Sequence, residues 1–434
     1  MSAKIKQLVP ALLGWFTACA RDLPWRKTQD PYAIWVSEIM LQQTQVKTVI
    51  PYWERWMRAL PTIANLAKAK PETIHKLWEG LGYYTRVRNM QRAAQEIIAQ
   101  HNGEFPRDYE AILALPGIGR YTAGAISSIA FNQPQPILDG NVIRVLTRVF
   151  GIAENPKDKS TNAQLWQLAQ ELVTSANEQE IKREKLHTPS PPSGERAGVR
   201  GHVEKWPHGE NWVEAANHIQ TIGPCSALNQ SLMELGALIC TPKQPQCLIC
   251  PLQKFCDAYK TGHTQLIPNL GPRVTVTERE FIAFVIEHRG RYLVRQRPEG
   301  QVNAHLWEFP NMEVLPEPES SEKAKLSPNR SLAWCRRFSV SGEGPAKAGT
   351  PYQTLAQLVE KHLGLQVESL TELCTIRHTI TRYRITLRAC RGSGKLKFKN
   401  KKLKMEWLAL ADLDKLAFTS AHRKILKQLQ IPAP

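Results

Sequence analysis

The sequence predicts two domains of different fold class, an all-α domain followed by an α/β domain. Up to about residue 176, apolar residues recur at helical spacing, as in Ile34, Ile39 and Met40. From residue 279 apolar and polar residues alternate instead, which is typical of β-strands. The chain of 434 residues is long enough to form two domains or more.

Successive helical stretches in the first domain are separated by short turns marked by Gly and Pro, which favours a helical bundle. One stretch contains Val46, Val49 and Ile50 and is expected to break at Pro51. The further helices are expected at 52–59, 71–79, 86–101, 108–115, 121–131 and 141–150.

The α/β domain is predicted from two alternating runs and two helical ones. FIAFVIEHRGRYLVRQR begins at Phe281, and TRYRITLRAC begins at Thr381. Helices are expected at 351–363 and 421–430. The domains are therefore assigned to residues 1–256 and 279–434, with a linker at 257–278.

Two stretches interrupt this pattern, at about 178–222 and 316–350. The first contains KLHTPSPPSGERAGVRGH, which has almost no large apolar residues and cannot bury a core. We expect both to be insertions, the first of them a surface loop.

The composition favours an intracellular protein with a polyanionic partner. The formal net charge is +18 and the pI is near 9.5, although attraction to ribosomes or to a membrane surface would suit these values too. No apolar run approaches the roughly 20 residues of a membrane helix, and the N-terminus lacks a signal-peptide pattern. The scattered Cys residues suit reduced thiols, so a cytoplasmic location is expected.

Four cysteines lie within seventeen residues, spaced C-x6-C-x2-C-x5-C: Cys240, Cys247, Cys250 and Cys256. Four thiolates so close in sequence can bind one compact metal centre. Zinc ribbons usually combine two C-x2-C pairs, and only one is present here. The spacing favours a [4Fe–4S] cluster, in which each iron takes one thiolate, with a zinc site as the alternative.

The segment LPGIGRYTA, from Leu115 to Ala123, predicts a tight hairpin between two helices at Gly117 and Gly119. The backbone N–H groups that begin the second helix are suited to binding a phosphate. Taken alone, the segment could equally be an ordinary helical corner.

The cysteines, the preceding QSLMELGALIC (230–240) and this hairpin resemble the helix-hairpin-helix superfamily of DNA repair enzymes, which includes endonuclease III. Within it, adenine DNA glycosylases fit best, over nearly the whole chain apart from the two insertions. The resemblance implies a monomer, associated with the nucleoid, that excises adenine mispaired with 8-oxoguanine or guanine in double-stranded DNA. It also implies a [4Fe–4S] cluster in the helical domain.

The resemblance implies two catalytic carboxyl groups, Glu38 and Asp139. SEIMLQQTQ, which contains Glu38, resembles the adenine-glycosylase signature, in which the glutamate protonates the base. Its apolar neighbours would raise the pKa of Glu38 and allow it to donate a proton. Asp139 lies before a helix and could simply be its N-cap, or it could stabilise an oxocarbenium-like transition state, or both.

Tyr121 indicates the subtype, because endonuclease III-type enzymes have a nucleophilic lysine at this place. Tyrosine implies base removal without dedicated strand cleavage, with Tyr121 and Asn141 bonded around Asp139 and the sugar. The resemblance also assigns Gln42, one helical turn from Glu38, as the wedge beside the extruded base.

The remaining base contacts follow from the same resemblance. Tyr83 is assigned to the DNA stack beside the opposing base, and Trp25 and Arg26 to the adenine pocket. The alternatives to this function are an endonuclease III-type enzyme acting on oxidised pyrimidines and an inactive DNA-binding relative.

The C-terminal domain resembles the Nudix (MutT) fold but lacks the metal-binding glutamates of that family. Aligned on Gly364, leucine, lysine and histidine stand where carboxylates would be needed. We therefore expect a reader of 8-oxoguanine rather than a hydrolase. The reading loop is assigned to Ile380, Thr381 and Arg382, where Thr381 supplies a hydroxyl group.

Overall fold

The chain folds as two compact units, Met1–Lys68 with Asn89–Arg273 and Ala69–Arg88 with Val274–Pro434. The segment Ala69–Arg88 lies inside the first predicted domain but packs with the C-terminal part of the chain. The computed structural model describes residues 2–186, 222–272, 275–314, 359–360, 363–368, 370–380, 382–396 and 404–431.

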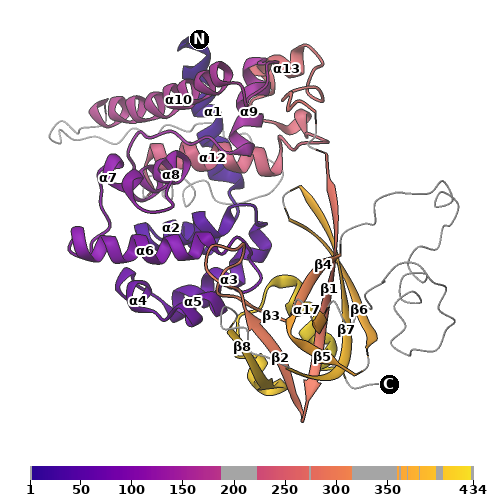
Figure 1. The fold of residues 1–434 in the computed structure, drawn as a ribbon. Coiled ribbons are helices and arrows are strands. Elements are labelled where there is room, and N and C mark those ends of the chain that lie inside the picture. The colour runs from indigo at the N-terminus through magenta and orange to yellow at the C-terminus, as the bar shows by residue number, and fades with distance from the viewer. Residues whose placement is uncertain are drawn as a thin grey trace, which may run out of the picture. The chain divides into compact units, whose positions relative to one another are not determined.

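The first unit is helical, and the second is built on a β-sheet (Figure 1), so the predicted order of an all-α and an α/β fold is confirmed. No helix among the described ranges is both long and apolar enough to span a bilayer. The helices from the N-terminus to residue 186 are α1 (Ser2–Cys19), η1 (Pro24–Arg26), α2 (Pro31–Leu41), α3 (Val46–Ala59), α4 (Ile63–Lys68), α5 (Pro71–Leu77), α6 (Thr85–Gln100), α7 (Tyr109–Ala114), α8 (Arg120–Phe131), α9 (Gly140–Phe150) and α10 (Lys159–Leu186). They are followed by α12 (Pro224–Leu238), η2 (Cys247–Ile249), η3 (Gln253–Phe255) and α13 (Asp257–Lys260).

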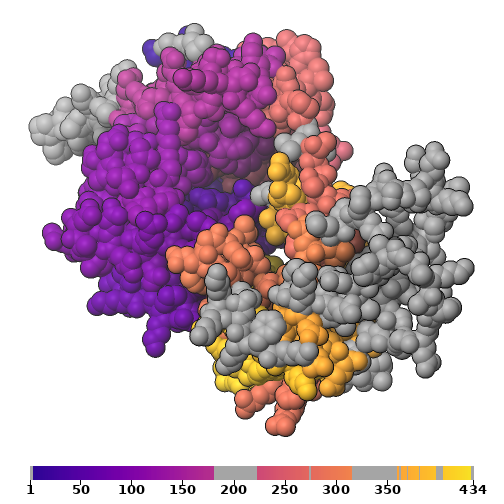
Figure 2. Space-filling model, viewed as in Figure 1, coloured from indigo at the N-terminus to yellow at the C-terminus, as the bar shows by residue number. Residues whose placement is uncertain are grey.

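The main core of the first unit lies between α1, α9, α10 and α12. Leu8, Val145, Leu172 and Leu228 are among the side chains that these helices bury there. Burial of each such side chain contributes about 1.5–3 kcal/mol, so helices far apart in sequence are held together. Figure 2 shows the surface of the N-terminal part of the chain in indigo and purple.

The expected break at Pro51 is wrong, because α3 runs through this proline. A proline inside a helix removes one backbone hydrogen bond and crowds the preceding turn. Val49 and Trp56 are fully buried on either side of Pro51. Their packing outweighs the local cost, which sequence periodicity alone could not weigh.

The first unit extends beyond the last cysteine. Lys4 Nζ forms an ion pair with Asp257 Oδ2 at 2.8 Å, and Arg148 Nε donates to the carbonyl oxygen of Ile267 over 2.8 Å. Residues 257–272, assigned to a linker by sequence, therefore pack on α1 and α9. Upstream, α10 runs to Leu186, and residues 187–221 of the first predicted insertion lie outside the described residues.

The second unit is a mixed sheet with the order β3-β2-β1-β7-β5, to which β4, β6 and β8 add by pairing with β1, β7 and β2. β1 and β7 are parallel, and the other pairs are antiparallel. The strands are β1 (Thr277–His288), β2 (Arg291–Gln296), β3 (Trp307–Glu308), β4 (Asn311–Val314), β5 (Leu365–Val367), β6 (Thr371–Ile380), β7 (Tyr383–Leu396) and β8 (Lys404–Ala409).

Both faces of this sheet are buried, as the alternation along β1 requires. Ile282 and Phe284 belong to one apolar cluster, whereas Ala283 and Val285 belong to the other. After β8 come the short helix α16 (Leu410–Leu413) and α17 (Ser420–Leu429), which covers the face of Ala283 and Val285. The expected insertion at 316–350 and most of the expected helix at 351–363 lie outside the described residues.

Candidate active site

Helix α2 carries a glutamate into the interior of the first unit. Asp30 caps the helix, and its middle turns are buried on every side. Glu38 is 5% exposed. Burial raises the pKa of Glu38 to about 7; the Tyr121 hydroxyl and Arg26 lower this pKa, whereas the charge of Asp139 raises it. The Glu38 carboxyl group can therefore hold a proton close to neutral pH and release it.

Asp139 is the N-cap of α9. Its Oδ1 accepts a hydrogen bond from Val142 N over 2.8 Å, and its Oδ2 accepts one from Asn141 Nδ2 over 2.9 Å. Burial raises the pKa of Asp139 above its ordinary value, while these hydrogen bonds lower it. The capping hydrogen bonds thus favour the ionised form of Asp139 and oppose the effect of burial on its pKa.

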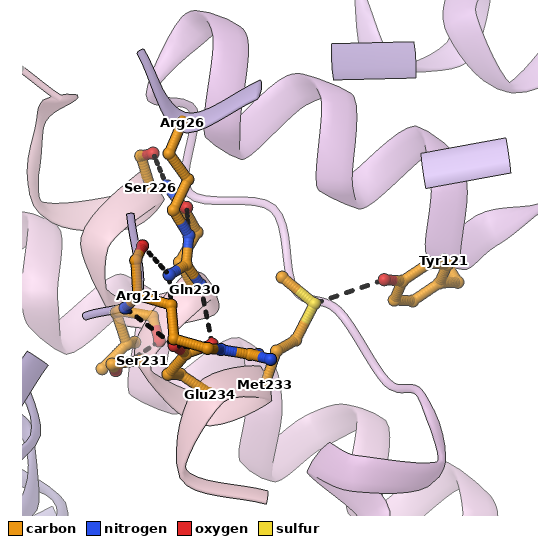
Figure 3. A network of polar contacts seen from close by, with 9 residues as sticks. Arg21, Arg26, Tyr121, Ser226, Gln230, Ser231, Met233 and Glu234 are labelled. Atoms are coloured by element: carbon orange, nitrogen blue, oxygen red, sulfur yellow. Dashed lines mark hydrogen bonds and ion pairs between the residues drawn. The ribbon is translucent and has the colours of Figure 1, made fainter. Parts of the chain in front are cut away.

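Tyr121, in the first turn of α8, bonds to Glu38 rather than to Asp139. Its hydroxyl donates to Glu38 Oε2 over 2.8 Å. The Tyr121 hydroxyl oxygen also lies 3.3 Å from Met233 Sδ (Figure 3). The sequence placed both Tyr121 and Asn141 around Asp139. The structure gives each carboxyl group its own donor: Asn141 contacts Asp139, and Tyr121 contacts Glu38.

Arg26 lies in a buried polar network beside this site (Figure 3). Its side chain is 11% exposed, and its Nη2 pairs with Glu234 Oε2 at 2.9 Å. Arg26 Nε donates to Gln230 Oε1 over 3.0 Å. Trp25 is buried next to it, edge-on to the ring of Trp53. Both residues singled out by sequence therefore help to form the interior near Glu38.

Glu234 is the partner that the sequence analysis missed. It pairs with Arg21 as well as Arg26, and its side chain is 1% exposed. Burial would raise the pKa of Glu234, but hydrogen bonds from Arg21 and Arg26 outweigh it and lower the pKa to about 2. A lone acid within the apolar helix LMELGAL was the available signal, because a buried carboxylate needs cationic partners.

Gln42 and Tyr83 are in conformations that periodicity did not predict. α2 ends at Leu41, and Gln42 is its C-cap residue, where the backbone leaves the helix with φ −56° and ψ 112°. Tyr83 belongs to the second unit and is 45% exposed, with a left-handed φ of 48°. Thr381 lies outside the described residues.

The predicted hairpin joins α7 and α8. Gly117 has φ 78°, and a Cβ built on it would lie 2.5 Å from Asn89 Cβ, so no other residue fits without strain. Gly119 caps α8 and has open space around it. No side chain at Gly119 therefore covers the first backbone N–H groups of α8, as a phosphate-binding helix end requires.

One cavity is lined by all four cysteines, Cys240, Cys247, Cys250 and Cys256. Burial, together with the charges of the other three cysteines, raises the pKa of Cys250 to about 12. Among the described residues, no three His, Cys, Asp or Glu side chains converge closely enough to hold a single metal ion. The four thiols instead line the wall of this cavity.

Two arginines of α9 contact the first cysteine, and sequence reasoning did not single them out. Arg148 Nη1 donates to Cys240 Sγ over 3.3 Å, and Arg144 Nε donates to its carbonyl oxygen over 2.6 Å. Arg144 Nη2 also donates to Asn141 Oδ1 over 2.8 Å. Their spacing of four residues on one helix, after Asp139, was the signal that could have identified them.

Residues 36–171 match the HhH-GPD superfamily base excision DNA repair protein family, and residues 282–428 match the NUDIX domain. The adenine DNA glycosylase of Rattus norvegicus is 35% identical over 367 residues, 73% of this chain and 62% of the relative. That of Buchnera aphidicola subsp. Baizongia pistaciae is 38% identical over 301 residues, 69% and 72% of the two chains. That of Buchnera aphidicola subsp. Schizaphis graminum is 33% identical, over 70% of this chain and 74% of the relative. The chain thus spans less than two thirds of the length of the rat relative.

Glu38→Gln is expected to stabilise the protein at alkaline pH. Between the unfolded pKa of glutamate, about 4.3, and the folded pKa of about 7, the folded state binds more protons than the unfolded state. The stability of the wild type therefore falls as pH rises through this window. Glutamine does not titrate, so the variant should exceed the wild type by up to roughly 3 kcal/mol at pH 8. Thermal unfolding at pH 4.5 and 8 measures the difference.

Glu54→Gln, at an exposed position of α3, is the matched control and should show no such gain. An equal stability change for Glu38→Gln at both pH values would contradict a raised folded pKa.

Gly117→Ala should destabilise the first unit by about 1–3 kcal/mol, because alanine has both a disfavoured φ and a clash with Asn89. Gly119→Ala serves as the control, since its Cβ meets nothing within 4 Å and its φ is −100°. Urea unfolding of the two variants compares them directly. Equal midpoints would show that the turn at Gly117 is not constrained as described.

Proposed function

Because this chain belongs to the adenine DNA glycosylase family, we propose that it removes adenine opposite 8-oxoguanine or guanine in double-stranded DNA. The proposal includes hydrolysis of the N-glycosidic bond without dedicated strand cleavage. A net charge of +18 suits the polyanionic substrate. We further propose that the protein acts as a monomer in the cytoplasm, in association with the nucleoid.

The observation that carries the proposal is a pair of carboxyl groups with different environments. Glu38 has a pKa of about 7, while Asp139 is held at a helix N-terminus by Asn141 and a backbone N–H. One group can act as an acid while the other stays ionised, as cleavage of a glycosidic bond needs.

In the proposed reaction Glu38 donates its proton to the ring of the flipped adenine. The electrons of the N-glycosidic bond then pass to the departing base, and the ionised Asp139 stabilises the positive charge on the sugar. Water adds to the sugar carbon and returns a proton to the Glu38 carboxylate, which restores the acid and leaves an abasic site. Tyr121 carries a phenol and cannot form the imine through which an amine would cut the strand.

Contacts to DNA follow the same reasoning. The glycines at 117 and 119 leave the start of α8 open for a phosphate, and base flipping is assigned to Gln42 and Tyr83. Reading of the opposing base is assigned to the turn between β6 and β7. Ile380 pairs with Tyr383 across that turn, which contains Arg382.

A [4Fe–4S] cluster is proposed for the cavity between the four cysteines. Four thiols around one volume fit a cluster that takes one thiolate per iron, and Arg148 donates toward one of the sulfurs. A positively charged metal centre would also favour ionisation of Cys250, whose pKa is raised by burial and by the charges of the other cysteines. When bound, the cluster would supply structural cross-linking of the loop 240–256.

The first test uses a duplex with one A:8-oxoguanine pair, incubated with the purified protein and then treated with hot alkali. Strand scission at the adenine should appear only after alkali. Glu38→Gln should lower the excision rate by roughly 10²–10⁴-fold, as loss of a general acid does, whereas Glu54→Gln should keep it. Scission without alkali would favour a lyase, and DNA binding without excision would favour an inactive relative.

The cluster is tested by iron and sulfide analysis of anaerobically purified protein. About four of each per chain are expected, and Cys250→Ser should lose them while Cys19→Ser, at an exposed position outside the cavity, should not. One zinc ion per chain without sulfide would refute the cluster.

A further inference from the structure

The segment Ala69–Arg88 is anchored to the sheet unit on both sides of Tyr83 in sequence. Lys76 and Glu79 precede the tyrosine, and Arg88 follows it. All of these residues belong to the same compact unit as Val274–Pro434. Their contacts therefore determine what holds the one aromatic side chain that the proposed function places beside the opposing base.

Glu79 makes the central contact. Its Oε1 accepts a hydrogen bond from Phe418 N over 2.9 Å, and its Oε2 accepts one from Lys76 Nζ over 2.8 Å. Lys76 Nζ also donates to the carbonyl oxygen of Leu416 over 2.9 Å. Arg423 Nε lies 3.8 Å from Glu79 Oε2. A carboxylate and an ammonium group thus bind two backbone groups of one short stretch.

That stretch is part of the core of the second unit. Phe418 is fully buried. Trp307 N donates to the carbonyl oxygen of Ala417 over 2.9 Å, and Thr419 N donates to that of Trp307 over 3.1 Å. Glu79 is therefore bonded to backbone that pairs with β3 and leads into α17, rather than to a free loop.

Two further contacts hold the ends of the segment. His75 is buried and stacks on His305, with ring centroids 6.3 Å apart and 13° between their planes. Arg88 Nη1 donates to the carbonyl oxygen of Ala304 over 3.1 Å. The region of His305 and Ala304 precedes β3, so both anchors also lead to the sheet.

The turn between these anchors is fixed internally. Gly82 and Tyr83 have φ of 71° and 48°, which only a well-supported turn holds. The carbonyl oxygen of Gly82 accepts hydrogen bonds from Trp78 Nε1 over 3.0 Å and from Arg86 Nη2 over 3.2 Å. The guanidinium of Arg86 also lies over the ring of Tyr83, 5.6 Å from its centroid.

We infer that Glu79 is a positioning residue that joins the Tyr83 turn to the sheet unit. Recognition of the opposing base then depends on the turn and on the sheet unit together. This inference rests on the proposed function. Glu38 and Asp139 lie in the first unit, whereas Tyr83 and the β6–β7 turn lie in the second. Loss of Glu79 should therefore weaken discrimination between 8-oxoguanine and guanine opposite adenine more than it slows excision.

The test compares Glu79→Gln with the wild type on A:8-oxoguanine and A:G duplexes. Affinities are measured with a non-excisable adenine analogue, and excision rates are measured at saturating enzyme. The affinity ratio of the two duplexes should fall on the order of tenfold, as loss of hydrogen bonds to a charged group allows. The excision rate should change by less than about twofold, on the order of 0.4 kcal/mol. Glu72→Gln, at an exposed position of α5 in the same segment, is the matched control and should keep the ratio.

A double variant separates positioning from a general loss of structure. In a Tyr83→Ala background, Glu79→Gln should cause no further fall in the ratio, because the residue through which it acts is gone. An additive fall, or a wild-type ratio in Glu79→Gln alone, would overturn the inference. If Glu79→Gln does not fold, Lys76→Met serves instead. It removes the ammonium group that binds Leu416 and Glu79, and it should lower the affinity ratio in the same way. If the wild type excises no adenine, the proposed function fails, and the affinity ratios still decide the inference.

Discussion

The helical unit depends on the buried carboxylate of Glu234, which joins α12 to the segment around η1. A carboxylate in the protein interior is tolerated only where cations and hydrogen-bond donors surround it, and Arg21 and Arg26 both pair with this one. The same helix supplies Met233 to Tyr121, and its Asn229 donates to Ser128 and to the carbonyl oxygen of Gln135. Asn229, Met233 and Glu234 of α12 thus each contact a different neighbouring segment, and the candidate site lies among these segments.

Glu38 and Glu234 show how burial can have opposite consequences for the same side chain. Both are almost inaccessible to solvent. Two guanidinium groups lower the pKa of Glu234 to about 2, whereas Glu38 has mainly a phenol as its partner and a pKa of about 7. A phenol can donate a hydrogen bond but brings no positive charge to offset desolvation. The first glutamate is therefore permanently ionised and structural, and the second can exchange a proton.

The sequence predicted the order of folds and many residues of the candidate site, because these depend on local spacing. Asp139 was recognisable as an N-cap, and the cysteines were recognisable from their spacing. The partner of Arg26 was not, since Glu234 is about 200 residues away and only tertiary packing brings them together. The helix through Pro51 and the packing of Ala69–Arg88 with the second unit were missed for the same reason. In each case a long-range contact outweighed a local preference.

The environments of both carboxyl groups are set from α12. A Cβ built on Gly236 would lie 2.6 Å from Asn141 Cβ, so only glycine lets α12 approach the start of α9 this closely. A glycine inside a helix costs about 0.5–1 kcal/mol relative to alanine. The close approach lets Arg144 Nη2 reach both the carbonyl oxygen of Gly236 and Asn141 Oδ1, which orients the Asn141 amide toward Asp139. Two residues earlier, Glu234 holds the arginine whose charge lowers the pKa of Glu38. One helix therefore moderates both pKa values, and a shift of α12 would change the acid and its partner carboxylate together.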